Sequence, residues 1–480
     1  MCGLGFQLIR KDAQLSGKKG AHPKVRKPDE DGTTLKVFGR LFTKSRKRKK
    51  QQNNSGGACV REEEIMRRED IEIMAPCGSY ESLHAAINAG ADSIYFGVGQ
   101  LNMRSASAAN FTLDDLAKIV ATAHAHGVKA YLTVNTVVYE EEIDTLHRLL
   151  DRAVAEKVDA VIVSDQAAIL YARSVGLEVH ISTQLSISNS ETVKFYSQWA
   201  DTVVLARELS LEQVASVSRR IEEENICGPN GERVKIEMFA HGALCMSVSG
   251  KCFLSLHATG CSANRGACRQ ICRHAYTLVD RDTGEELHTD GPYLLSPKDL
   301  CTIDFLDRFV EAGVRVLKIE GRARPAEYVK RVVECYDRAL RAIEHGSFTP
   351  ERVAKWKEEL STVFNRGYWG GYYLNSPVVE LSKNYGSSAS VRKVYVGRIT
   401  NVFKKAKVGE ILVEASPLEL GRKVLITGET TGAVEFKPEQ IWVDEHPVEV
   451  ALQGRKCSVK LPQQIHRGDR LYKYVPAEEV

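Results

Sequence analysis

Long hydrophobic runs are missing from this 480-residue sequence: no stretch of eighteen or more apolar residues occurs, so no membrane-spanning helix is expected. The N-terminal residues also lack the apolar core of a secretory signal peptide. Twelve cysteines in a chain without such a signal are typical of a reducing compartment. We therefore expect a cytoplasmic protein with free thiols.

Motifs of two common hydrolase classes and of one cofactor-binding fold are also absent. The sequence has no His-Glu-x-x-His zinc helix and no Gly-x-Ser-x-Gly nucleophile turn. No Gly-x-Gly-x-x-Gly follows the first predicted strand, which disfavours a doubly wound dinucleotide-binding sheet. Peptide hydrolysis would therefore need a cysteine nucleophile paired with a histidine such as His241 or His274.

Positive charge is concentrated at the N-terminal end. Residues 1–58 hold 15 Lys/Arg and 4 Asp/Glu, a balance of +11 within a total of +4, so the remaining residues carry about −7. Residues 1–69 show no hydrophobic periodicity and are predicted to be a disordered basic tail. An acidic body is not typical of a general nucleic-acid binder, so any RNA contact needs a local basic patch.

A strand–helix alternation occupies residues 70–345. About eight apolar, β-branched strands alternate with helices, which favours parallel pairing through helical crossovers. We therefore predict an α/β fold, a TIM-like (β/α)8 barrel with a cysteine-rich insertion at 242–275 after strand seven. Residues 346–385 are predicted to form a helical, aromatic-rich connector. The short alternating strands of 386–480 predict a small C-terminal all-β barrel.

The cysteine-rich stretch is the most informative part of the chain. Four of its cysteines leave gaps of six, fifteen and three residues: Cys245, Cys252, Cys268 and Cys272. A 4Fe-4S cluster takes one thiolate per iron, and tetrahedral zinc also takes four ligands. Zinc ligands usually come in closely spaced pairs, so the wide gaps favour iron–sulfur, with zinc and unligated thiols as alternatives. Because the stretch leaves strand seven, we expect it to open on the active face of the barrel.

Polar residues gather where the predicted barrel strands end, on the side of a barrel that carries its active site. The catalytic candidates are His241, Asp165 and Glu320. The candidates for substrate binding, all amides or cations, are Asn135, Gln184, Arg207, Lys298, Arg322 and Arg324. The catalytic candidates have plainer alternatives: His241 as a packed histidine, Asp165 as a helix cap, and Glu320 as part of a buried ion-pair network.

The cysteine-rich stretch also resembles a known family signature. The matching residues are Glu237, Phe239, Gly242, Cys245, Gly250, Cys252 and Ser255. They stand as in the signature of the collagenase-like peptidases, peptidase family U32. The resemblance extends over about residues 70–480 and includes the run MAPCGSYESLHAAINAGADSIYFG. Several members of that family are oxygen-independent hydroxylation proteins that carry a 4Fe-4S cluster.

Within this family, the layout is most similar to the branch that forms 5-hydroxyuridine at the wobble position of tRNA. The resemblance implies an RNA-modifying enzyme with tRNA and a prephenate-like small dianion as partners. It also implies that the cluster ligands are Cys245, Cys252, Cys268 and Cys272. The basic candidates Arg207, Lys298, Arg322 and Arg324 would then hold the dianion. The alternatives are a peptidase, as the family name states, and hydroxylation of rRNA.

Overall fold

The computed structural model describes residues 66–106, 111–286, 291–376 and 378–479. Most of the predicted basic tail therefore lies outside the described residues. The prediction of disorder is wrong for the end of this tail, because the short 3-10 helix η1 spans Arg68–Asp70. There the buried Arg68 pairs with Asp92 and Asp337 at 2.9 and 2.8 Å. Within the described residues, no helix is both long and apolar enough to cross a bilayer.

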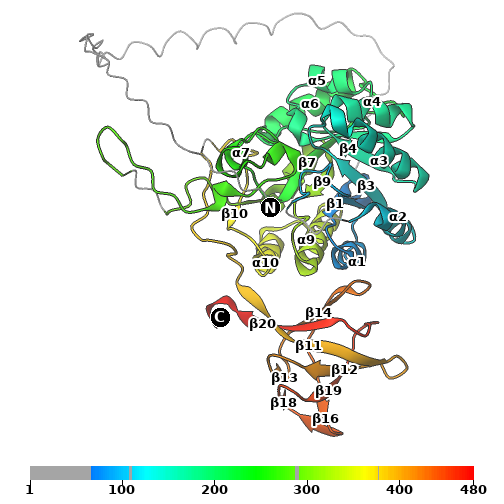
Figure 1. Cartoon of the computed structure of the whole chain (residues 1–480), viewed down its shortest axis with the longest axis vertical. Helices are drawn as coiled ribbons and strands as arrows, with labels where there is room; N and C mark the ends of the chain where they lie inside the picture. The colour runs from blue at the N-terminus through cyan, green and yellow to red at the C-terminus, as the bar shows by residue number, and fades with distance from the viewer. Residues whose placement is uncertain (1–65, 107–110, 287–290, 377, 480) are drawn as a thin grey trace, which may run out of the picture. The chain divides into compact units, whose positions relative to one another are not determined.

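Parallel strands close a barrel at the centre of the described chain (Figure 1). Strand β9 pairs with both β1 and β7, and this double pairing closes the barrel. The result confirms the predicted TIM-like fold. The barrel strands are β1 (Glu72–Pro76), β2 (Ser93–Phe96), β3 (Lys129–Val134), β4 (Ala160–Val163), β5 (Glu178–Ile181), β6 (Thr202–Val204), β7 (Lys235–Ala243) and β9 (Val314–Ile319).

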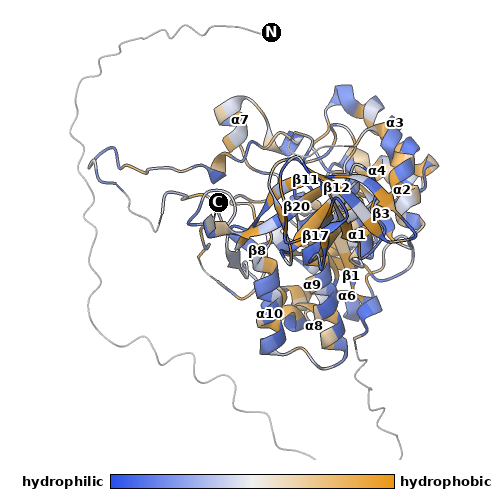
Figure 2. Cartoon of the chain, turned by 90° about the horizontal axis from the view of Figure 1, so that it is seen from below, coloured by the Kyte–Doolittle hydropathy of each residue, from blue (hydrophilic) through white to orange (hydrophobic). Residues whose placement is uncertain are grey.

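Helices cover the outside of the barrel because each presents an apolar face to the strands. In α3 the buried residues recur at helical spacing, at Leu146, Leu149, Leu150 and Ala153, with hydrophilic residues elsewhere on the helix (Figure 2). The barrel helices are α1 (Tyr80–Asn88), α2 (Leu116–His124), α3 (Ile143–Ala155), α4 (Gln166–Ser174), α5 (Ser190–Tyr196), α6 (Leu211–Glu223), α8 (Leu306–Glu311) and α9 (Ala326–Glu344).

The inside of the barrel combines apolar packing with a buried ion pair. Alternate strand residues point inward and form a cluster of Met74, Tyr95, Tyr131, Ala160, Ile162 and Val316. Beside this cluster, the ammonium of Lys318 lies 2.6 Å from the carboxylate of Glu237. The barrel interior is therefore filled with side chains, and the cavity associated with the barrel lies beyond the C-terminal ends of its strands.

The cysteine loop (residues 242–275) leaves the barrel at the end of β7, as predicted. It contains α7 (Leu254–Thr259) and the 3-10 helices η5 (Ala263–Arg265) and η6 (Ile271–Arg273). After it, β8 (Asp299–Cys301) pairs antiparallel with the end of β7, and β10 (Tyr368–Trp369) pairs with β8. Strand β8 thus extends the sheet outside the barrel, and the chain re-enters the barrel at β9.

The connector begins with α10 (Pro350–Ser361) and then packs its aromatic residues against the barrel. The hydroxyl of buried Tyr373 donates to the carbonyl of Phe239 in β7 at 2.8 Å, and the ring of Tyr368 packs against that of His241 in the same strand, at a centroid distance of 5.3 Å. These rings therefore stabilise the contact between connector and barrel.

The C-terminal residues form an antiparallel all-β domain. One sheet has the order β15-β14-β20-β11-β12-β19-β16-β17, and β13 pairs with β18. The inward residues form a separate core that includes Val396, Ile411, Ile426 and Leu471. The strands are β11 (Val391–Phe403), β12 (Val408–Val413), β13 (Leu418–Glu419), β14 (Val424–Gly428), β15 (Gly432–Phe436), β16 (Ile441–Val443), β17 (His446–Val448), β18 (Val450–Ala451), β19 (Lys456–Lys460) and β20 (Arg470–Pro476).

Candidate functional site

A cavity of about 220 Å³ lies at the C-terminal ends of the barrel strands, beneath the cysteine loop. Its wall combines residues that follow several strands with residues of the loop itself. Ten of the thirteen predicted site residues line it: Cys245, Cys252, Cys268, Cys272, Asn135, Gln184, Arg207, Glu320, Arg322 and Arg324. The position matches the active face of a TIM barrel.

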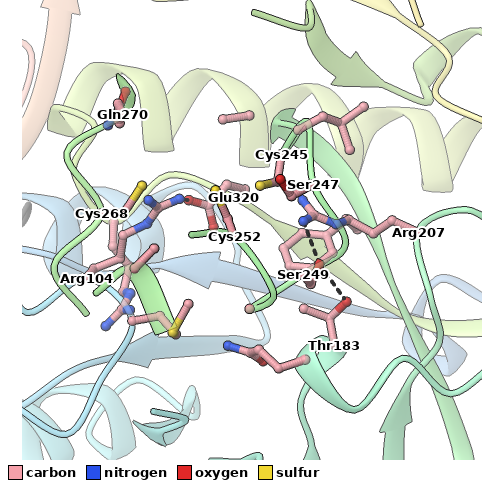
Figure 3. A pocket seen from close by; sticks show the side chains of 18 of the residues that line it. Arg104, Thr183, Arg207, Cys245, Ser247, Ser249, Cys252, Cys268, Gln270 and Glu320 are labelled. Carbon is pink, nitrogen blue, oxygen red and sulfur yellow. Dashed lines mark hydrogen bonds and ion pairs between the residues drawn. The ribbon is translucent and has the colours of Figure 1, made fainter. Parts of the chain in front are cut away.

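The four predicted ligand cysteines share this cavity and are free thiols. They come from separate parts of the loop: Cys245 follows β7, Cys252 precedes α7, Cys268 follows η5 and Cys272 lies within η6. Figure 3 shows Cys245, Cys252 and Cys268 around one space. The loop packs closely against the barrel at Gly250, where an added Cβ would lie 2.7 Å from a side-chain carbon of Gln184. This close approach at a glycine holds the segment between Cys245 and Cys252 against the strand ends.

The donor set fits a group that takes four thiolates. Burial raises the pKa of the Cys272 thiol; Arg273 opposes the rise, and the other three cysteines add to it by repulsion. The four sulfurs therefore lie close enough to interact electrostatically. In the described part of the chain, no three His, Cys, Asp or Glu side chains are drawn together into a metal-binding arrangement. The number and type of donors fit a 4Fe-4S cluster or zinc, and this fit rests on the residues that share the cavity, not on the distances between their sulfurs.

Glu320 is held as a carboxylate at the end of β9. It forms an ion pair with Arg104, and Tyr95 donates to it at 3.4 Å (Figure 3). Burial raises the pKa of Glu320, but Arg104, Arg322 and Arg207 together lower it below its ordinary value. Glu320 is therefore ionised near neutral pH and is suited to hold cations or accept hydrogen bonds.

Cations dominate the cavity wall. Arg207 donates a hydrogen bond to Ser249 at 2.6 Å. Arg322 donates to Asn102 and to Thr133, each at 3.0 Å, and its burial lowers its pKa to about 10. The basic lining residues are Arg104, Arg207, Arg273, Lys318, Arg322, Arg324 and Arg366. Among the described residues, Glu320 is the one carboxylate in this lining. The cavity is therefore suited to anions.

His241 does not line the cavity. It is 1% exposed and packs against the rings of Tyr336 and Tyr368, at centroid distances of 5.6 and 5.3 Å. Burial, with a contribution from Arg324, lowers its pKa to about 3, so the imidazole is neutral. This environment matches the alternative of a packed histidine.

Asp165 and Lys298 also lie outside the lining. Asp165 caps α4 by accepting from the backbone of Ala167 at 2.9 Å, and it accepts from Val138 at 3.0 Å. Lys298 precedes β8 and pairs with Glu380 at 2.6 Å. The structure thus places both in local structural contacts.

Sequence reasoning missed several lining residues. Arg104 follows β2 in a loop without periodicity, and Arg366 comes from the connector, far along the chain. Neither stands in a motif that points to the cavity. Gln270 and Arg273 also line the cavity, and they lie within two residues of Cys272. Their closeness to a predicted ligand cysteine could have identified them from the sequence.

Comparison with known proteins gives a consistent family match. The family model described as Peptidase family U32 matches residues 78–383. A protein named collagenase from Porphyromonas gingivalis strain W83 is 51% identical over 414 residues, which cover 86% of this chain and 100% of that protein.

Two other relatives are named for RNA modification. A tRNA hydroxylation protein of Bacillus subtilis is 34% identical over 343 residues, covering 69% of this chain and 77% of that protein. A 23S rRNA 5-hydroxycytidine synthase of Escherichia coli is 33% identical over 393 residues, covering 79% of this chain and 57% of that protein.

Proposed function

The chain belongs to peptidase family U32, and from this premise we propose that it is an iron–sulfur enzyme that hydroxylates tRNA to form 5-hydroxyuridine at the wobble position. The observation that carries the proposal is one cavity that joins four free thiols to a cationic wall. The thiols suit iron, which they bind as thiolate ligands, and the arginines suit the phosphate or carboxylate groups of an anionic ligand.

Cys245, Cys252, Cys268 and Cys272 would hold the cluster. When bound, a 4Fe-4S cluster held by four cysteines would supply one-electron redox chemistry. The rest of the cavity wall is formed by side chains that already have partners. Arg104 forms an ion pair with Glu320, and Arg322 donates hydrogen bonds to Asn102 and Thr133. These contacts hold guanidinium groups in place before a ligand arrives.

The cationic wall supports two kinds of anionic ligand. Arg207, Arg322 and Arg324 suit a prephenate-like dianion, because guanidinium groups bind carboxylates through paired hydrogen bonds. Asn135, Gln184 and Gln270 offer amides that can read the edge of a pyrimidine. A uridine in an anticodon loop is unpaired, so it can enter a cavity without the cost of opening a helix.

The peptidase alternative rests on the name of the P. gingivalis relative. A cysteine peptidase needs a histidine within hydrogen-bond reach of its thiol. Among the described residues, no cysteine sulfur is hydrogen-bonded to a histidine, and His241 is enclosed by tyrosines. The site geometry therefore favours ligation of the thiols, and an enzyme acting on RNA, over cysteine proteolysis.

Anaerobic purification tests the cluster first. We expect a brown protein with about four iron and four sulfide per chain and absorption near 400–420 nm, as a 4Fe-4S thiolate cluster gives. Cys268→Ser should lose most of the iron. The matched control is Cys261→Ser, because Cys261 lies in the same loop but does not line the cavity. One zinc per chain without sulfide would contradict the proposal.

Mass spectrometry of tRNA nucleosides tests the reaction. Expression in a host without its own 5-hydroxyuridine pathway should restore the modified nucleoside, and Cys268→Ser should abolish it. Hydroxylated rRNA without hydroxylated tRNA would move the substrate to rRNA. Cleavage of gelatin by the pure protein, lost in Cys245→Ser, would support the peptidase instead.

A further inference from the structure

The stretch between Glu237 and Asp280 contains no Asp or Glu, although the chain beyond residue 58 is acidic overall. The same stretch holds Lys251, Arg265, Arg269 and Arg273. It forms the cysteine loop that covers the cavity. The loop is therefore a local basic surface on an acidic body, and it lies at the mouth of the site.

The four cations differ in what they can still bind. Arg265 forms an ion pair with Glu142 at 2.6 Å and lies over the ring of Tyr139 at 3.9 Å. Arg273 is half-buried and donates to backbone carbonyls, including that of Leu244 at 2.6 Å. In contrast, Lys251 and Arg269 are exposed, and neither forms an ion pair with a carboxylate of the described chain; the guanidinium of Arg269 contacts the sulfur of Cys261, at 4.0 Å. Two cations are thus available to an external anion.

The same loop exposes several apolar side chains within a short stretch of sequence. Phe253 is 66% exposed and directly follows Cys252. Its exposed apolar neighbours along the chain are Met246, Val248, Leu254 and Leu256. Helix α7, which carries some of these side chains, lies at the periphery of the molecule in Figure 2. Apolar side chains that are exposed together in one segment often mark a site that a partner covers.

We propose that this face of the cysteine loop binds an unpaired RNA loop, with Phe253 stacking on a base and Lys251 and Arg269 contacting the adjacent phosphates. Lys251 lies two residues before Phe253, and the backbone N–H of Arg269 donates to Ser255 at 3.0 Å, so both cations belong to the segment that carries the ring. An exposed ring with nearby cations suits single-stranded RNA, because stacking tolerates any base and cations follow the backbone. A neighbouring nucleotide then reaches the cavity. This inference rests on the proposed function, since it assigns a surface to that RNA.

Binding of a short RNA hairpin with uridines in its loop, to the cluster-loaded full chain, tests the stacking contact. Phe253→Ala should weaken Kd roughly 10-fold, as loss of one stacked base does. The matched control is Phe195→Ala, because Phe195 is a similarly exposed phenylalanine, 55% exposed, on α5. A fully paired duplex should bind all three proteins alike. The iron content of each variant is measured to exclude damage to the cluster.

Salt dependence tests the phosphate contacts. Each phosphate contact to a single strand contributes about 0.7 to the steepness with which the logarithm of the RNA association constant falls with the logarithm of the salt concentration. The double variant Lys251→Glu, Arg269→Glu should therefore reduce this slope by about 1.4. The control is Lys235→Glu, because Lys235 begins β7 and the cysteine loop follows the other end of that strand. An unchanged slope overturns the phosphate contacts.

The outcomes separate this inference from the proposed function. If 5-hydroxyuridine forms but Phe253→Ala matches Phe195→Ala in Kd and KM, the surface assignment is wrong and the function stands. If the hairpin binds through Phe253 and no hydroxylated nucleoside appears, the surface stands and the function fails. A chain that is dimeric in solution and becomes monomeric in Phe253→Ala, without loss of RNA affinity, would assign the apolar face to a second copy instead.

Discussion

Replacement of Lys318 by methionine tests how the barrel supports the cavity above it. The Lys318 ammonium lies 2.6 Å from Glu237, and the two side chains are 7% and 0% exposed. The second oxygen of Glu237 has no hydrogen-bond partner within the described chain, and His180 lies 3.8 Å from it. Loss of the lysine would leave a buried carboxylate without its cation. Breaking such a pair costs roughly 3–5 kcal/mol of unfolding free energy.

Urea unfolding followed by circular dichroism measures this cost. Combining Lys318→Met with Glu237→Gln removes the stranded charge, so the double variant should recover most of the loss. The control is Lys357→Met, which breaks an exposed pair with Asp304 at 2.6 Å and should cost less than about 1 kcal/mol. If Lys318→Met costs no more than the control, or if the double variant is the least stable, the buried pair does not stabilise the barrel as argued.

Three further predictions follow from single contacts. Cys272→Ser should lose bound iron and sulfide while Cys261→Ser keeps them, as chemical analysis would show. Asp165→Ala should lower the unfolding free energy by about 1 kcal/mol through loss of the α4 cap, with modification activity per folded molecule unchanged; a large loss of activity would make Asp165 catalytic. Burial raises the pKa of Glu359, but the larger combined effect of Arg338 and Arg331 brings this pKa below its ordinary value. The ion pairs of Glu359 therefore stabilise the fold fully above the unfolded pKa, and this contribution is lost as pH falls through the folded pKa. Glu359→Gln should therefore be about 1 kcal/mol less stable at pH 7, and the difference should disappear only as pH falls through the folded pKa of Glu359, below its ordinary value; a pH-independent difference would refute the ion pairs.

The barrel could be predicted because its strands carry their own signal. In β1 the residues Ile73, Met74 and Ala75 are all buried, as a strand enclosed on both faces requires, and Ser79 then caps the next helix. Repetition of this pattern identified the fold and placed the cysteine loop after β7. Strand β8 has no such signal, since it is three residues long and pairs outside the barrel.

The errors of placement have local causes. The pairing of β7 with β9 shifts register between Phe239 and His241, and such an irregularity re-aims a side chain. Phe239 lines the cavity, whereas His241 faces the tyrosines outside it. Lys298 precedes a short strand outside the barrel and does not end a barrel strand, so the rule that strand ends face the active site does not apply to it.

The cationic wall shows why composition could not reveal the ligand. The residues that make it extend from Arg104 to Arg366, and apart from Lys318, Arg322 and Arg324 they come from segments far apart in the sequence. Their summed charge is hidden by an acidic surface elsewhere, so net charge indicates the opposite preference. Burial also makes these charges costly unless anions face them. Glu320 faces Arg104, but the wall retains an excess of cations that four thiolates and an anionic substrate would offset. The cysteines and arginines therefore form one electrostatic unit, and loss of either set should weaken binding at the other.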